Sequence, residues 1–197
     1  PNVDVLHKGI EFEGSWRPSG SLKLIGMLSI GDWEYTKDFE SNIFDDQQQL
    51  IGTGKLYTKG AKVGDAAQFT MSLGADYRIG SINLDANYRF VDGLYADYSI
   101  VDSAFLSPDN PGALKLPSFG LVDFGASIPI KLSKKNPDNQ LTFRLNVNNL
   151  FDTTYIAESN TNIHADASST KWNGVDVNNS VWFGFGRTWN AAFRYNF

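Results

Sequence analysis

The residues of this 197-residue chain that could do chemistry are few and widely spaced. Without any cysteine, the chain cannot use a catalytic thiol, a Cys-x-x-Cys redox pair or a cysteine-ligated zinc ion. Its two histidines, His7 and His164, fit neither an HExxH nor an HxxxH spacing. No arrangement of Ser, His and Asp resembles a hydrolase triad either. The sequence therefore predicts no catalytic residue, no metal site and no enzyme activity.

Two patterns could bind phosphate or calcium, but each lacks part of what the chemistry needs. The run from Gly52 to Leu56 contains a Gly-Lys pair, yet Gln49 and Leu56 stand where a phosphate-binding loop needs Gly and Ser or Thr. Several acidic residues without EF-hand spacing could bind calcium from loops: Asp45, Asp46, Asp92, Asp97 and Asp102. We expect these to be solvated loops, with no bound cofactor.

Charge and hydropathy narrow the class of protein further. Seventeen basic against 22 acidic residues give a net charge of -5, which argues against a nucleic-acid partner. No stretch approaches the roughly 18 consecutive apolar residues of a transmembrane helix, and the first residues lack the pattern of a signal peptide. We expect a chain that begins as a mature protein or in the middle of a longer one.

Apolar residues recur at every second position along most of the chain. This period is that of a β-strand with one apolar and one polar face. About seven strands are expected, at 10–16, 22–30, 68–79, 82–90, 122–130, 141–147 and 181–197. No convincing helical period lies between them. The sequence therefore predicts an all-β, antiparallel fold.

Charged residues fall almost entirely on the polar parity of these strands. The residues on that parity are Glu11, Glu13, Arg17, Lys23, Asp76, Arg78, Asp85, Arg89, Asp123, Arg144 and Arg194. Only Arg187 falls on the apolar parity. One face of the predicted sheet is thus nearly free of charge and must contact either lipid or another protein layer.

Connection lengths separate these two environments. Short turns at 17–20, 80–81 and 134–139 alternate with long connections at 35–66, 99–118 and 152–179. Short turns on one side and long loops on the other are typical of an outer-membrane barrel. Aromatic residues would form a girdle at the short-turn ends (Trp16, Tyr77, Phe197) and another at the long-loop ends (Trp33, Tyr35, Tyr95, Trp182).

The C-terminal third of the chain carries specific motifs. The run from Leu141 to Tyr155 contains Asn149-Leu150-Phe151-Asp152, and Gly184 with Arg187 precedes an alternating aromatic strand that ends on Phe197. These segments resemble the last two strands of TonB-dependent outer-membrane receptors, and Gly9 to Glu13 with Arg17-Pro18 resembles another hairpin of that family. One departure is Gly186, where the family commonly has Pro.

The resemblance implies an antiparallel transmembrane β-barrel in the bacterial outer membrane. The family's barrel has 22 strands around an N-terminal plug. Residues 1–197 would then be the C-terminal part of such a barrel, with about seven strands and without the plug. The implied partners are outer-membrane lipid, the remaining strands and plug, TonB acting through the plug, and the barrel-assembly machinery. A surface lipoprotein is a further candidate partner.

The resemblance also implies uptake of a scarce ligand such as a siderophore, a cobalamin or a glycan. Residues expected to face the lumen or the plug, or else to pair across strands, are Asp76, Arg78, Asp85, Arg89, Arg144 and Arg194. Ligand candidates in the exposed loops are Phe39, Phe44, Tyr57, Phe105 and Trp172, and the predicted assembly signal is Phe193, Tyr195 and Phe197. Two alternatives remain: a porin-like barrel without a plug, and a soluble sugar-binding β-sandwich.

Overall fold

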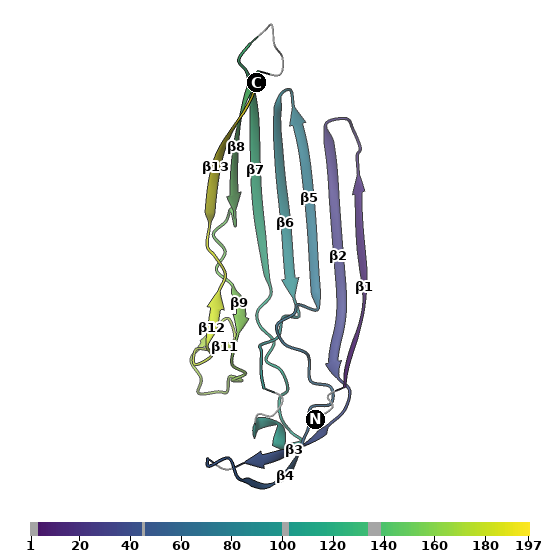
Figure 1. Ribbon diagram of the computed structural model, residues 1–197, viewed down its shortest axis with the longest axis vertical. Coiled ribbons are helices and arrows are strands. Elements are labelled where there is room, and N and C mark those ends of the chain that lie inside the picture. The colour runs from purple at the N-terminus through teal and green to yellow at the C-terminus, as the bar shows by residue number, and fades with distance from the viewer. Residues whose placement is uncertain (1–3, 45, 100–102, 134–138) are drawn as a thin grey trace.

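A seven-stranded antiparallel sheet forms the body of the protein, whose computed structural model describes residues 4–44, 46–99, 103–133 and 139–197. Neighbours in the sheet follow chain order (Figure 1), and the strands are β1 (Val5–Trp16), β2 (Leu22–Tyr35), β5 (Phe69–Ile79), β6 (Ile82–Asp92), β7 (Phe119–Lys131), β8 (Gln140–Asn148) and β13 (Thr188–Asn196). The prediction of an all-β antiparallel fold with about seven main strands is confirmed. Among the described residues, no helix is long and apolar enough to cross a membrane.

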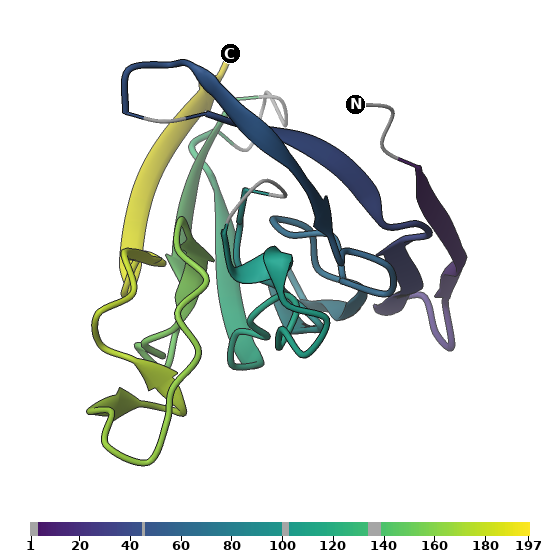
Figure 2. The ribbon, with the colours of Figure 1, turned by 90° about the horizontal axis from the view of Figure 1, so that it is seen from below.

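The sheet is curved and open. Figure 2 shows the strands arranged as a trough, with β1 and β13 at its two sides. These strands end the order of the sheet and do not pair with each other. A sheet that is part of a larger barrel is curved and has two unpaired edges, because only the closed barrel pairs every strand edge.

Strand register separates the side chains into an outer and an inner face. One cross-strand row joins Gly26, Leu73, Tyr88 and Val122, and the next row joins Met27, Ser72, Arg89 and Leu121. A shift of one residue in any strand would exchange the two faces. The apolar parity is therefore one continuous surface across the sheet, as the sequence predicts.

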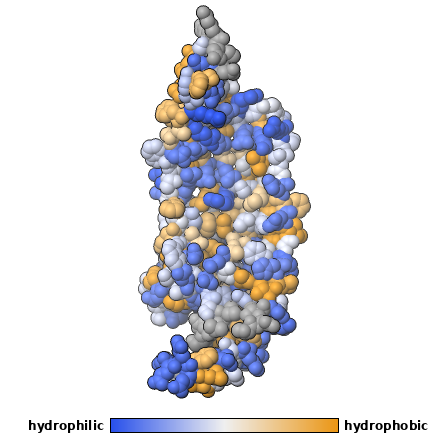
Figure 3. Space-filling model, viewed as in Figure 1, coloured by the Kyte–Doolittle hydropathy of each residue, from blue (hydrophilic) through white to orange (hydrophobic). Residues whose placement is uncertain are grey.

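The polar row lies on the concave side of the trough. Asp85 of β6 and Arg144 of β8 reach each other across β7, which requires that their side chains converge. Figure 3, viewed from this side, shows mainly hydrophilic and intermediate residues over the strands. The apolar parity consequently lies on the convex face, where Ile10, Phe12, Leu73 and Phe193 are exposed.

The length of the apolar band fits a lipid bilayer. On β7 the outer face runs from Gly120 to Ile130 without a charge. The ten steps between these two residues, at about 3.3 Å each and tilted by about 40°, correspond to a height of about 25 Å, the usual value for an outer-membrane barrel. Toward the long loops the same face becomes charged, where Lys8 and Lys62 contact Asp32 at 2.8 and 2.5 Å.

The last predicted strand is two strands. β12 (Val181–Phe183) pairs with β9 (Ile156–Ser159) outside the main sheet, and β13 starts only at Thr188. The expectation of one strand over 181–197 is therefore wrong. The break at residues 184–187 also explains why Arg187 falls on the apolar parity, since the alternation restarts after it.

The three long connections contain their own structure. They include the hairpin of β3 (Phe39–Phe44) and β4 (Leu50–Leu56), the short 3₁₀ helix η1 (Ser103–Leu106), β9, β12 and a small pair formed by β10 (Lys171–Trp172) and β11 (Val175–Asp176). Asp45, Asp102 and most of the turn at 134–139 lie outside the described residues.

The predicted aromatic girdle at the long-loop ends needs a correction. Trp33 and Tyr35 have the parity of the inner face of β2. Trp33 stacks on His7 at a centroid distance of 5.3 Å, and Tyr35 packs edge to face on Tyr98 at 6.3 Å. The Trp33 ring therefore packs within the sheet against β1, and the Tyr35 ring supports the second long connection. Trp16 and Tyr77, at the short-turn ends, do lie exposed on the outer face.

Candidate functional site

The inner face of the sheet carries a network of polar side chains. The Ser72 hydroxyl donates to Asn87 Oδ1 at 2.7 Å, and the Asn146 amide donates to Asn190 Oδ1 at 2.9 Å. Both are contacts between neighbouring strands, so polar groups on this wall stabilise one another across the sheet. The wall can therefore face water or another polar surface.

An ion pair spans three strands in the middle of this wall. Arg144 Nη1 and Nη2 lie 2.8 and 3.0 Å from the two carboxylate oxygens of Asp85, and Arg144 Nε donates to Asn146 Oδ1 at 2.8 Å. The pair passes above Gly125 of β7. A Cβ at Gly125 would lie 2.3 Å from Asp85 Oδ2 and 2.5 Å from Arg144 Nη2. Glycine at this position therefore makes room for the bidentate contact.

We predict that Gly125→Ala displaces this ion pair. The added methyl group should cost about 1 kcal/mol of unfolding free energy, since the pair is partly exposed and its side chains can move. Gly74→Ala is the matched control, because its Cβ would meet nothing closer than 3.5 Å. Alanine loses less backbone conformational entropy on folding than glycine, so Gly74→Ala should leave the stability unchanged or slightly higher. Urea unfolding of both variants in detergent measures the difference, and equal stabilities would contradict the assigned role of Gly125.

The six predicted lumenal residues all have the parity of the inner face, but they do not form one cluster. Asp76, Arg78, Asp85 and Arg144 line a hollow of about 420 Å³ near the short turns, together with Arg17 and Lys23. Arg89 lines a separate hollow of about 410 Å³ near the long loops, and Arg194 lies on β13. Within the described ranges, only Asp85 and Arg144 of the six form an ion pair. For these two, the alternative of pairing across strands is the one observed.

The Asn149-Leu150-Phe151-Asp152 motif forms a tight turn directly after β8, which we call the joint. Asn149 has a positive φ of 49° and Asp152 one of 56°, a conformation that Asn and Asp tolerate best among residues other than Gly. The Asn149 N–H donates to Asp123 Oδ1 at 2.9 Å, and its side-chain amide donates to the Thr153 and Phe185 carbonyls. Asp152 Oδ1 accepts the Arg187 N–H at 2.7 Å. The motif thus holds both ends of the third loop, residues 149–187, at the end of the sheet.

Gly184 completes this joint. Its N–H donates to the Tyr155 carbonyl at 2.9 Å, and a Cβ at this position would lie 1.9 Å from the Tyr155 ring. The same ring stacks on Phe119 at a centroid distance of 4.2 Å. The residues that carry the family resemblance therefore have a structural role, which the sequence alone did not indicate.

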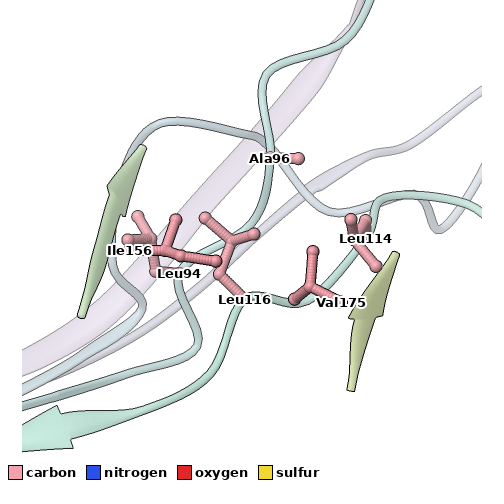
Figure 4. Packing of buried hydrophobic residues seen from close by; sticks show 6 residues of the cluster. All are labelled: Leu94, Ala96, Leu114, Leu116, Ile156 and Val175. Atoms are coloured by element: carbon pink, nitrogen blue, oxygen red, sulfur yellow. The ribbon is translucent and has the colours of Figure 1, made fainter. Parts of the chain in front are cut away.

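The second and third loops share an apolar cluster at the long-loop end of the sheet (Figure 4). The second loop covers residues 93–118. The buried members of the cluster are Leu94, Ala96, Leu114 and Leu116 from this loop, and Ile156 and Val175 from the third. The Asp97 N–H donates to the Ser159 carbonyl at 2.8 Å, and the Leu114 N–H donates to Asn162 Oδ1 at 2.6 Å. These two loops therefore pack as one unit.

A second cluster joins the first loop to the second. Phe105 of the second loop is buried against Leu56 and Ala61 of the first, and it stacks on Tyr98 at 5.2 Å. The Tyr98 hydroxyl donates to the Lys62 carbonyl at 2.6 Å, and burial raises the pKa of this phenol well above its usual range. We call the three joined loops, residues 36–68, 93–118 and 149–187, the cap. The second loop is its centre, because both clusters include it.

The predicted ligand residues of the loops differ in their accessibility. Phe105 is 1% exposed, and Phe39 and Trp172 are partly buried against the two clusters. Phe44 is exposed, and Tyr57 lines a polar hollow of about 400 Å³ between the first two loops, with Lys55 Nζ 4.8 Å from its ring centroid. Packing of this kind depends on contacts between distant segments, so no local sequence signal could separate these roles.

Acidic residues of the cap approach one another without forming a metal site. Burial raises the pKa of Asp65, and the nearby carboxylates Asp97 and Glu158 raise it further. Among the described residues, no three His, Asp or Glu side chains are arranged to hold a metal ion.

Comparison with known proteins identifies the family of this wall. Residues 2–150 match the family model described as TonB dependent receptor-like, beta-barrel. No curated protein matches the sequence.

Several solved structures share the fold. The ferric-catecholate import receptor Fiu from E. coli K12 is 16% identical over 99% of this chain, with a TM-score of 0.59 and 21% of the receptor covered. The ferric yersiniabactin uptake receptor FyuA from Yersinia pestis is 16% identical over 99% of this chain, with a TM-score of 0.60 and 24% covered. The FrpB iron transporter from Neisseria meningitidis is 20% identical over 98% of this chain, with a TM-score of 0.52 and 23% covered.

The chain thus spans about a fifth to a quarter of the length of these receptors. Both the family model and the open, two-faced sheet agree with the sequence-based resemblance. Since the family model matches residues 2–150, well over half of the chain, the chain belongs to the TonB-dependent receptor-like β-barrel family of the bacterial outer membrane.

Proposed function

We propose that this chain forms the C-terminal part of the wall of a TonB-energised outer-membrane transporter. The observation that carries the proposal is the curved sheet, in a chain of this family, whose convex face has an apolar band free of charge and whose concave face is polar. Such a wall excludes lipid from a water-filled lumen. In this proposal the remaining strands of the 22-stranded barrel and the plug belong to sequence outside this chain.

The transported ligand is proposed to be scarce in the surroundings: a siderophore, a cobalamin or a glycan. The names of two related structures support the first class, since one is a ferric-catecholate import receptor and the other a ferric yersiniabactin uptake receptor. Receptors of this family are transporters, and we propose no enzyme activity for this chain.

Contacts to the plug are proposed for the charged residues of the inner face. Arg78, Arg89, Arg194 and Asp76 make no ion pair within the described part of the chain, so their charges are free to bind a polar surface in the lumen. Asp85 and Arg144 already compensate each other. In this proposal TonB acts on the plug and does not touch this chain.

Ligand contact is proposed for the accessible aromatic side chain that lines a hollow of the cap. Tyr57 presents ring surface there, whereas Phe39, Phe105 and Trp172 would act by holding the loops in place. A surface lipoprotein that binds the cap remains a candidate partner.

The C-terminal aromatic residues are proposed as the signal for barrel assembly. Phe193 and Tyr195 are exposed on the outer face of the edge strand β13, and the exposed Phe197 directly follows the last residue of that strand. This edge is therefore available to the assembly machinery before the barrel closes.

Growth under nutrient limitation tests the transport function. A strain that lacks the full receptor should fail to grow on one limiting nutrient, supplied as a ferric siderophore, a cobalamin or a glycan, and a TonB-deficient strain should fail on the same nutrient. Return of the receptor should restore growth only when TonB is present. Uptake that persists without TonB would contradict the proposal and favour a porin-like barrel, and growth unaffected on all three nutrients would also contradict it.

A further inference from the structure

The β3–β4 hairpin leaves the wall and crosses the open side of the trough. Its strands pair from Phe39 and Leu56 at the base to Phe44 and Leu50 near the tip. Figure 1 places the hairpin beyond the long-loop end of the sheet, and Figure 2 shows it passing over the concave side toward the β13 side. The hairpin therefore lies over the region that the sheet would enclose.

The base of the hairpin is fixed in the cap. Leu56 is buried against Phe105, and the Tyr57 N–H donates to the Phe105 carbonyl at 2.7 Å. Asp38 Oδ2 lies 3.1 Å from Lys55 Nζ, and the other carboxylate oxygen accepts the Lys59 N–H at 3.0 Å. These contacts hold the direction in which the hairpin projects.

The two strand ends of the hairpin, which we call its tip, carry large apolar side chains that are uncovered within the described structure, whereas the turn between them, residues 46–49, is polar. Phe44, Leu50 and Ile51 are 56%, 58% and 64% exposed. A lone two-stranded hairpin is marginally stable in water, and large apolar side chains gathered at one place mark a contact surface. The tip thus has the chemistry of a surface that packs against other apolar groups.

The occupant follows from where the tip lies. The chain spans about a fifth to a quarter of the length of the receptors it resembles, and its sheet is open at β1 and β13. A wall that closes this sheet must face its concave side, and the hairpin already projects over that side.

We propose that the β3–β4 hairpin is an arm across the mouth of the barrel, whose tip packs against apolar side chains of extracellular segments from the rest of the same receptor. The proposal rests on the proposed larger barrel. It gives this chain a part in closing the mouth, beyond building the wall.

Cysteine labelling tests the arm, because this chain has no cysteine of its own. Ile51→Cys and Phe44→Cys probe the tip, and Lys171→Cys on the exposed face of the third loop is the control. Each is placed in the full receptor without other cysteines. A membrane-impermeant maleimide is applied to whole cells and to the purified monomeric receptor, and each rate is divided by the rate in denaturant.

Both tip cysteines should react at least about tenfold more slowly than the control, in cells and in the purified monomer. Tip cysteines that react as fast as the control in cells would overturn the proposal. Protection in cells that disappears in the purified monomer would also overturn it, because the occupant would then be a separate partner or a second copy. Two tip positions are used so that the test remains valid if one variant is not exported to the cell surface. The labelling does not depend on transport, so its failure is distinct from a failure of the growth test.

Discussion

Replacement of Leu116 by alanine should loosen two of the three loops of the cap together. Leu116 is 1% exposed and packs with Leu94 of its own loop and Ile156 of the third. Loss of a buried leucine side chain costs about 2–5 kcal/mol, depending on how far the site can collapse. We expect faster amide hydrogen exchange in residues 93–118 and 149–187.

The same variant should leave the wall and most of the first loop protected. The first loop is held by the separate cluster around Phe105, and the sheet has its own hydrogen bonds. Leu106→Ala is the matched control, because Leu106 is in the same loop but 42% exposed. If exchange rises equally in both variants, or rises in the second loop alone, the third loop does not depend on this cluster and the cap is not one packed unit.

The wall could be predicted from sequence because the signals that specify its strands and faces are local and repeat along the chain. Alternation fixes which side chains share a face, and charges that would be costly in lipid appear on one parity only. Short turns such as that at 80–81 then bring neighbouring strands together. These signals placed Leu73 outside and Arg89 inside without knowledge of any contact.

The cap and the joint could not be predicted because they depend on contacts between distant segments. Phe105, chosen from the sequence as an exposed ligand residue, is buried by Leu56 and Ala61 of another loop. Trp33 and Tyr35 were expected in a girdle, yet their parity turns them inward. The role of Gly125 arises only when Asp85 and Arg144, 59 residues apart, meet above it. A glycine in a strand gave no indication of that contact.

If the convex face contacts lipid and the concave face lines an aqueous lumen, a new charge should be tolerated on the concave face only. Leu73 and Met27 test it as a matched pair, since both are apolar residues in the middle of neighbouring strands. Leu73 is on the outer face and 54% exposed, and Met27 is on the inner face, 40% exposed and opposite Glu13. An arginine at Leu73 would lie in the bilayer, whereas one at Met27 would lie in water near a carboxylate.

The most direct measurement is therefore the unfolding free energy of Leu73→Arg and Met27→Arg in the full receptor, folded in lipid vesicles and titrated with denaturant. We predict that Leu73→Arg loses about 2–4 kcal/mol, the usual cost of an arginine near the midplane on the lipid side of a barrel. Met27→Arg should lose less than about 1 kcal/mol, because a charge on the lumen side stays hydrated. Equal losses at the two positions, or a larger loss at Met27, would contradict the assignment of the two faces.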